Sequence, residues 1–109
     1  MKITDVDLFQ VEVPLIPAIA KSRQRIYDIT ICRIRTDEGL EGIGESAVYN
    51  LSSNGRAALE ERAASFVGVD PLVLNAFGEL PLFECALLDI SGQAYGIPVH
   101  KFFGERVRD

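Results

Sequence analysis

The stretch PLFECALLDISGQAYGIPVHKFFG, residues 81–104, decides the fold of the second half of this 109-residue chain. Pro81 fits the first position of a helix, and Gly96 with Pro98 ends that helix. Apolar residues recur at helical spacing and also occupy most of the remaining helix surface, so the helix needs neighbours on more than one side. Because the sequence stops at Asp109, we expect the second surface that would bury this helix to be missing.

The first half of the chain alternates between apolar and polar residues, which predicts β-strands. Residues 2–13 and residues 26–36 form two such segments. Asp37-Glu38-Gly39 then supplies the glycine that a short hairpin requires, and residues 40–48 return as a third strand. The pattern predicts a three-stranded antiparallel meander.

Helix signals follow the third strand. Ser53 or Asn54 can cap a helix that runs to Gly68, and Asp70 followed by Pro71 predicts a short helix over residues 71–77. Together with the helix that begins at Pro81, these signals predict an α+β fold, in which the meander is followed by a small bundle of about three helices.

Length, charge and cysteine content exclude several classes of function. The length suits one domain, and 48% apolar with 25% charged residues is ordinary for a folded globular chain. A net charge of -5 argues against nucleic acid or an anionic membrane as a partner, and no apolar run approaches the ~20 residues of a membrane span. Cys32 and Cys85 fit no metal or redox spacing, and without a signal peptide they predict a cytoplasmic protein.

Few residues carry chemistry. Gly42-Ile43-Gly44 lies within a strand rather than before a helix, so it favours a bend or a close backbone approach over a phosphate cradle. His100 is the only histidine, which excludes a His cluster for zinc, and we expect it to be a surface or packing residue. Glu84 and Asp89 point about 140° apart on a helix, so they cannot act as an acid–base pair. We expect Asp89 to be a buried hydrogen-bonding group at an interface rather than a catalytic residue. We therefore assign no catalytic residue and no metal ligand.

Two loops leave the same end of the meander and could line one pocket. Residues 16–25 bring the cations Lys21, Arg23 and Arg25, and residues 48–54 bring the hydroxyl and amide groups of Tyr49 and Asn50. This mixture suits a small carboxylate or a polyol. The alternative is that both loops are polar only because they lie at the surface.

The chain resembles the N-terminal capping domain of the enolase superfamily, in particular its mandelate racemase/muconate lactonizing enzyme branch. The resemblance rests on DEGLEGIGE at residues 37–45, on ALLDISGQAYGIPV at residues 86–99 and on Gly104. It covers nearly the whole chain, although Leu88 stands where family members carry tryptophan. It implies a capping domain at residues 1–98 and, at residues 99–109, the start of a connection to a (β/α) barrel that is absent from this chain.

The resemblance also implies a function. Such enzymes use Mg²⁺ and bases in the barrel to remove the α-proton of a carboxylate substrate in a racemase, dehydratase or cycloisomerase reaction. The two loops would close over the barrel mouth, and Lys21, Arg23, Tyr49 and Asn50 are the predicted substrate contacts. No metal ligand or base of the family maps onto this chain, so it is expected to be inactive alone and to form a homo-oligomer through residues 80–104.

Two alternatives remain open. The first is a free-standing, non-catalytic module that binds a small anion or associates with itself. The second is an unrelated α+β domain in which both motifs occur by coincidence.

Overall fold

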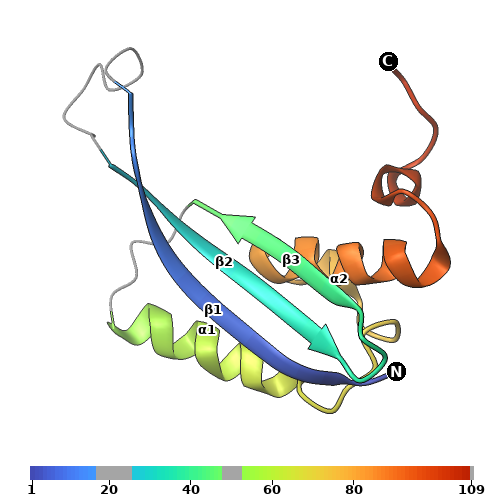
Figure 1. Cartoon of the computed structure of the whole chain (residues 1–109), viewed down its shortest axis with the longest axis horizontal. Helices are drawn as coiled ribbons and strands as arrows, with labels where there is room; N and C mark the ends of the chain where they lie inside the picture. Colours follow the sequence, from blue (N-terminus) through green and yellow to red (C-terminus); the bar gives the residue numbers. More distant parts are fainter. Residues whose placement is uncertain (17–25, 48–52, 109) are drawn as a thin grey trace.

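The computed structural model describes residues 1–16, 26–47 and 53–108, which form a three-stranded sheet with helices on one of its faces (Figure 1). Strands come first along the chain and helices follow. The strands are β1 (Ile3–Pro14), β2 (Ile26–Thr36) and β3 (Glu41–Ser46), and the helices are α1 (Ser53–Phe66), α2 (Pro81–Tyr95) and the short 3-10 helices η1 (Ala76–Gly78) and η2 (Val99–Phe103). This arrangement confirms the predicted α+β fold class.

The sheet is an antiparallel meander with the strand order β1-β2-β3. The β2–β3 hairpin turns at Gly39, whose φ of 81° lies in the left-handed region that favours glycine. Thr36 closes the turn, because its backbone N–H donates to the Leu40 carbonyl at 3.0 Å. The predicted hairpin is therefore confirmed.

β1 and β2 are longer than β3. Their pairing runs from Ile3 opposite Thr36 to Pro14 opposite Ile26, whereas β3 ends at Ser46, opposite Thr30. Beyond Thr30 the two longer strands continue as a two-stranded ribbon, which projects past the helices in Figure 1. The end of β1, the start of β2 and the end of β3 thus lie at the same end of the sheet.

The hydrophobic core lies between the sheet and the two α-helices. Alternation along β2 turns Cys32 and Ile34 toward the helices, where both are fully buried. Phe66 of α1 meets Phe83 of α2 edge-on, with ring centroids 5.2 Å apart. The other buried apolar residues of this cluster are Ile3, Leu59, Ala63, Ala76, Leu82, Ala86, Leu87, Leu88 and Ile90. One core therefore joins the sheet, α1 and α2.

The expectation that α2 lacks a second burying surface is wrong. The helix contacts β2, β3, η1 and η2, and Phe83 packs on α1. Its buried residues are Leu82, Phe83, Ala86, Leu87, Leu88, Ile90 and Gly92. The helix is apolar on several sides, as expected, and this fold supplies the neighbours that bury these residues. Gly96 ends the helix with a φ of 67°, as predicted.

The short helix predicted over residues 71–77 is also wrong. Asp70 does act as a cap, since its Oδ1 accepts from the Leu72 N–H at 2.9 Å, but the chain then turns, and only Ala76–Gly78 is helical. Pro71 and Ala76 are both buried, and a helix would turn residues five apart about 140° away from each other. Burial of both residues therefore favours turns over a helix.

Within the described residues, no helix combines the length and the apolar composition that crossing a bilayer requires.

Candidate functional site

The four predicted substrate contacts, Lys21, Arg23, Tyr49 and Asn50, lie outside the residues that the structure describes. Their assignment stays a prediction. The structure does describe the strand ends on which the two segments are built, and the register places these ends together at one end of the sheet. The sequence-based inference that both segments leave the same end of the meander agrees with this register.

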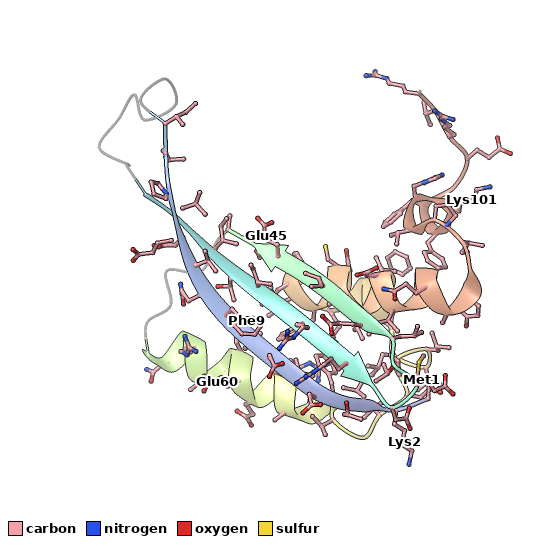
Figure 2. The ribbon with its side chains drawn as sticks, in the orientation of Figure 1. Met1, Lys2, Phe9, Glu45, Glu60 and Lys101 are labelled. Atoms are coloured by element: carbon pink, nitrogen blue, oxygen red, sulfur yellow. The ribbon has the colours of Figure 1, made fainter. Side chains whose placement is uncertain are left out.

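The described side chains next to that end are largely apolar. Phe9, Val11 and Val13 share the face of the sheet opposite the helices, and each is about two fifths exposed, at 42%, 37% and 38%. Figure 2 labels Phe9 on β1 and Glu45 on β3. Phe9 pairs with Ile31 of β2, and Ile31 pairs with Glu45, so the three residues form one row across the sheet. Ile16 is 59% exposed. The sequence carries a signal for this row, because the apolar positions of β1 change face between Leu8, which packs against the core, and Phe9. A single alternating pattern over the whole strand conceals that change.

Charged residues occupy the other half of the outer face. Asp7 Oδ2 accepts from Arg33 Nη2 at 3.0 Å and from Arg35 Nη2 at 3.2 Å. Asp5 Oδ2 lies 3.8 Å from the same Arg35 Nη2. The Arg33 guanidinium also stacks over the Phe9 ring, 5.2 Å from its centroid. The charges are engaged with one another, so this group is a cross-strand ion-pair network rather than a set of catalytic groups.

Beneath this network lies the Cys32 thiol. Burial, and to a smaller degree the negative charge of Asp7, raises the pKa of Cys32 from 9.0 to about 12. A thiol with so high a pKa stays protonated at neutral pH and is a poor nucleophile. Cys32 is thus a core residue, in agreement with its lack of a redox partner in the sequence.

Asp89 accepts hydrogen bonds from a backbone N–H and from a side-chain amide, neither of which is an acid or a base at neutral pH. Its Oδ2 accepts from the Ile43 N–H at 3.0 Å, and its Oδ1 accepts from Gln93 Nε2 at 2.9 Å. The expected hydrogen-bonding role is therefore confirmed, but Asp89 is half-buried rather than buried. Gly42 and Gly44 are confirmed as a site of close backbone approach, because carbonyl groups of α2 lie where their Cβ atoms would be.

Metal binding finds no support in the described residues. In residues 1–16, 26–47 and 53–108, no three His, Cys, Asp or Glu side chains gather where they could hold an ion. The donors present here therefore do not fit a resident Mg²⁺ ion.

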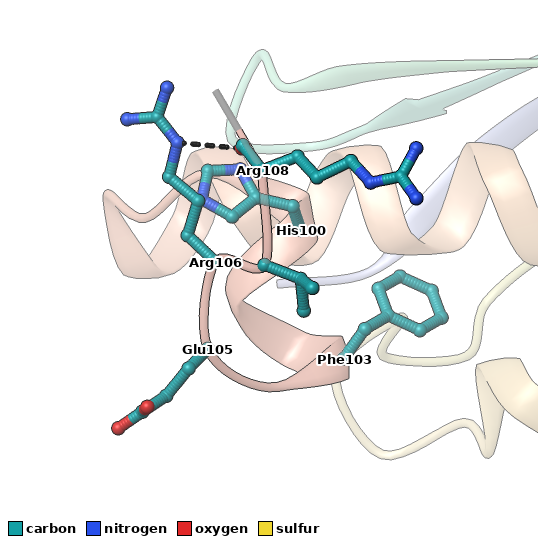
Figure 3. Close-up of a pocket in the computed structure, with 6 residues that line it drawn as sticks. His100, Phe103, Glu105, Arg106 and Arg108 are labelled. Atoms are coloured by element: carbon teal, nitrogen blue, oxygen red, sulfur yellow. Dashed lines mark hydrogen bonds between the residues drawn. The ribbon is translucent and has the colours of Figure 1, made fainter.

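A hollow of about 680 Å³ lies beside η2 (Figure 3). It is lined by His100, Phe103, Glu105, Arg106, Val107 and Arg108. Arg106 Nε donates to the Arg108 carbonyl at 3.0 Å, and Figure 3 shows Glu105 turned away from both guanidinium groups. His100 is exposed, as the sequence predicted. The lining mixes charges of both signs and pairs no nucleophile with a base, so the hollow has no catalytic arrangement.

No protein-family profile matches the chain. Individual proteins are nevertheless similar to it in sequence. A cis-3-hydroxy-L-proline dehydratase from Roseibium aggregatum is 29% identical over an alignment of 132 residues, which covers 100% of this chain and 36% of that enzyme. A D-galactonate dehydratase from Variovorax paradoxus is 31% identical over 94 residues, which cover 71% of this chain and 25% of the enzyme.

Solved structures agree with these sequence matches. The muconate lactonizing enzyme from Pseudomonas putida superimposes with a TM-score of 0.75 and 27% identity, covering 100% of this chain and 34% of that enzyme. A protein from Roseovarius nubinhibens ISM, assigned to the mandelate racemase/muconate lactonizing group and solved with magnesium, has a TM-score of 0.77 and 30% identity, covering 100% and 34%. This chain therefore spans about a third of the length of the proteins it matches, and it corresponds to their N-terminal region.

Proposed function

Because this chain belongs to the mandelate racemase/muconate lactonizing branch of the enolase superfamily and matches its N-terminal region, we propose that it is a capping domain. In this proposal it closes the active site of an enzyme that removes the α-proton of a small carboxylate. Residues 16–25 and 48–54 are the closing segments, which exclude water and select the substrate.

One observation carries the proposal: nearly the whole chain superimposes on the N-terminal region of longer enzymes. The substrates named for the relatives, a hydroxyproline, galactonate and muconate, are all small carboxylates. Cationic Lys21 and Arg23 would pair with such a carboxylate, and Tyr49 and Asn50 would hydrogen-bond its other polar groups. An acid sugar, a muconate-like acid and a dipeptide are the substrate classes that this proposal includes.

The described fold suits a rigid support for closing segments. The ribbon of β1 and β2 projects past β3, and the end of β3 lies beside it, so both segments start from paired backbone. The sheet is in turn fixed to α2 by the contact at Gly42 and Gly44. A hinge near the segment ends would move the segments and leave the core in place.

Mg²⁺ and the bases of the reaction belong, in this proposal, to another part of the protein. The described residues do not form a site for the ion. The contribution of this chain is the enclosure of the substrate, and it is expected to be inactive as an isolated 109-residue protein.

The test begins with the mass of the protein expressed from its native gene, compared with the 12.0 kDa of this chain. A cap joined to a barrel of ~250 residues would give a mass three to four times larger. That protein is then incubated in D₂O with galactonate, cis-3-hydroxy-L-proline and muconate, and turnover together with deuterium incorporation into substrate or product is followed by NMR. A native mass of 12.0 kDa would contradict the proposal and support a free-standing binding module.

Substitutions separate the capping role from the chemistry. Arg23→Ala and Asn50→Ala are expected to raise KM and shift the preference among carboxylates, since each removes a substrate contact. Arg33→Gln is the matched control, because it removes a cation of the outer sheet face that is paired with Asp7. If Arg33→Gln changes substrate preference as much as Arg23→Ala does, these segments do not select the substrate.

A further inference from the structure

β3 is an edge strand of the sheet, yet two of its outward backbone groups are already hydrogen-bonded. The Ile43 N–H donates to Asp89 Oδ2 at 3.0 Å, and the Glu41 carbonyl accepts from Gln93 Nε2 at 2.7 Å. Gln93 Nε2 also donates to Asp89 Oδ1 at 2.9 Å. An edge strand normally leaves such groups open, where they can pair with another chain.

The two capped groups are those that a neighbouring strand would use. Residues 41 and 43 are two apart, so their backbone groups point to the same side of β3, and one offers an acceptor where the other offers a donor. Asp89 and Gln93 are four apart on α2 and therefore share one face of the helix. The carboxylate stands in for the carbonyl of a partner strand, and the amide stands in for its N–H.

We propose that Asp89 and Gln93 form an edge clamp, which keeps β3 from pairing with β3 of a second copy of this chain. This inference does not depend on the proposed capping function.

The opposite edge of the sheet is covered by backbone at the start of β1. Ile3 of β1 donates its N–H to the Val69 carbonyl at 2.9 Å and accepts from the Gly68 N–H at 2.8 Å. There the turn after α1 supplies true backbone partners. On β3 no backbone segment of the described chain does so, and the clamp supplies the equivalent pair of hydrogen bonds from side chains.

A second copy is the partner that the edge geometry favours. An antiparallel β3–β3 pair centred on Ile43 is symmetric, so each capped group would meet its complement in the other copy. The Ile43 side chain is 51% exposed and would gain an apolar neighbour. Glu41 would then face Glu45 of the other copy, and like charges in direct opposition weaken a strand pair. The edge clamp and this charge repulsion both oppose pairing of β3 with β3 of a second copy.

The test is a site-specific cross-link in the 109-residue chain. The parent for the test carries Ile43→Cys to report pairing, Cys85→Ser to remove the exposed native thiol, and Glu41→Gln to remove the charge repulsion while keeping the carbonyl. Asp89→Leu and Asp89→Asn are then compared in this parent under mild oxidation. Both replacements have the same number of side-chain heavy atoms as aspartate and branch at Cγ, but only asparagine retains an oxygen that can accept the Ile43 N–H.

Asp89→Leu is expected to raise the fraction of cross-linked dimer about fivefold or more, the factor that the loss of one hydrogen bond gives in an equilibrium. Asp89→Asn should stay near the parent. A control with Val73→Cys in place of Ile43→Cys should give no increase, since residue 73 is 75% exposed but lies outside the sheet. A folded Asp89→Leu protein that cross-links no more than the parent, or an equal rise at residue 73, would overturn the proposal.

Gln93→Leu keeps the test decisive if Asp89→Leu does not fold, because Gln93 is exposed. Its loss frees the Glu41 carbonyl and Asp89 Oδ1 but leaves Asp89 Oδ2 in place for the Ile43 N–H, so a smaller rise in cross-linking is expected. Circular dichroism establishes that each variant is folded before cross-linking. Amide hydrogen exchange at Ile43 provides a second measurement, and it should be faster in Asp89→Leu than in Asp89→Asn if the aspartate oxygen protects that N–H.

Discussion

Gly42 of β3 lies directly against the backbone carbonyl of Ala86 in α2, so that a Cβ atom at Gly42 would be 2.1 Å from the carbonyl oxygen. Gly44 stands in the same relation to the Leu82 carbonyl, at 2.0 Å. Two strand residues advance about 6.7 Å and four helix residues about 6 Å, so the two contacts repeat in register. Because Gly42 and Gly44 have no side chains, the backbone of α2 can approach β3 this closely.

Replacing either glycine with alanine should therefore force the helix away from the sheet. We expect Gly42→Ala and Gly44→Ala each to lower the free energy of unfolding by about 3 kcal/mol, at the upper end of the usual cost of overpacking. The obstacle is backbone oxygen, which cannot rotate away as a side chain can. Urea denaturation followed by circular dichroism measures the change.

Gly39→Ala is the matched control for this prediction. Gly39 has a φ of 81° but no atom within 4 Å of its Cβ position. Its replacement should cost only about 1 kcal/mol, from the strained backbone angle. A cost at Gly39 equal to that at Gly42 would show that conformational strain, and not the contact with α2, explains the loss.

A second prediction concerns Arg62 and Glu79, which join α1 to the segment before α2. Arg62 Nε donates to Glu79 Oε2 at 3.1 Å, its Nη2 bonds the other carboxylate oxygen, and its guanidinium lies 4.8 Å from the centre of the Phe66 ring. The hydrogen bond to Glu79 raises the pKa of Arg62. Because Arg62 is half exposed, Glu79→Gln should lower the unfolding free energy by only about 1 kcal/mol.

The comparison for this pair is Arg56→Gln on the same helix. Arg56 and Glu60 form an exposed pair four residues apart, a type that contributes about 0.3–0.5 kcal/mol. We expect Glu79→Gln to be the more damaging change in thermal denaturation. Equal effects would indicate that the two-point geometry and the contact with Phe66 add nothing to an ordinary surface ion pair.

The two cysteines should differ in reactivity. Cys85 is exposed on α2, whereas Cys32 is fully buried and its pKa is raised to about 12. At pH 8 a thiol reagent should modify one cysteine per folded chain rapidly, and Cys85→Ser should abolish this fast phase. Rapid modification of the Cys85→Ser protein without denaturant would contradict the buried position of Cys32.

The raised pKa of Cys32 also predicts a loss of stability at high pH. Between 9.0, the ordinary pKa, and about 12, the unfolded chain loses the thiol proton while the folded protein retains it. The contribution of Cys32 to the free energy of unfolding is therefore fully present below pH 9. Above pH 9 it falls as pH rises, by up to about 1.4 kcal/mol per pH unit. Cys32→Ala should show a shallower decline over this window in urea titrations, even though it is less stable at pH 7.

Self-association through the face around η1 and η2 gives a further prediction. Phe77 and Phe103 contact each other edge-on, with centroids 5.5 Å apart, and are 54% and 65% exposed. Tyr95, at 61% exposed, and Ile97 add apolar surface from the end of α2. We expect the isolated chain to form dimers at high concentration and Phe77→Ser with Phe103→Ser to weaken them. Light scattering that gives a monomer mass for the parent at every concentration would refute this.

Local patterns in the sequence were sufficient for most of the elements. Alternation predicted the strands, Gly39 predicted the hairpin, and Pro81 with Gly96 predicted the bounds of the last helix, because these signals act through the backbone of a few neighbouring residues. The position of Asp89 on an apolar helix likewise indicated a hydrogen-bonding group. The family followed from two motifs whose residues all lie at the β2–β3 hairpin and on α2 with its continuation.

Tertiary structure alone decided the rest. The turns at residues 71–75 replace a predicted helix because Pro71 and Ala76 must both reach the core, a requirement set by distant residues. The several buried sides of α2, the partners of Asp89 and Gln93, and the open apolar row of Phe9, Val11 and Val13 also depend on which segments lie together. The sequence indicates which residues favour burial or hydrogen bonding. The packing of segments that are far apart along the chain determines which residues become their neighbours.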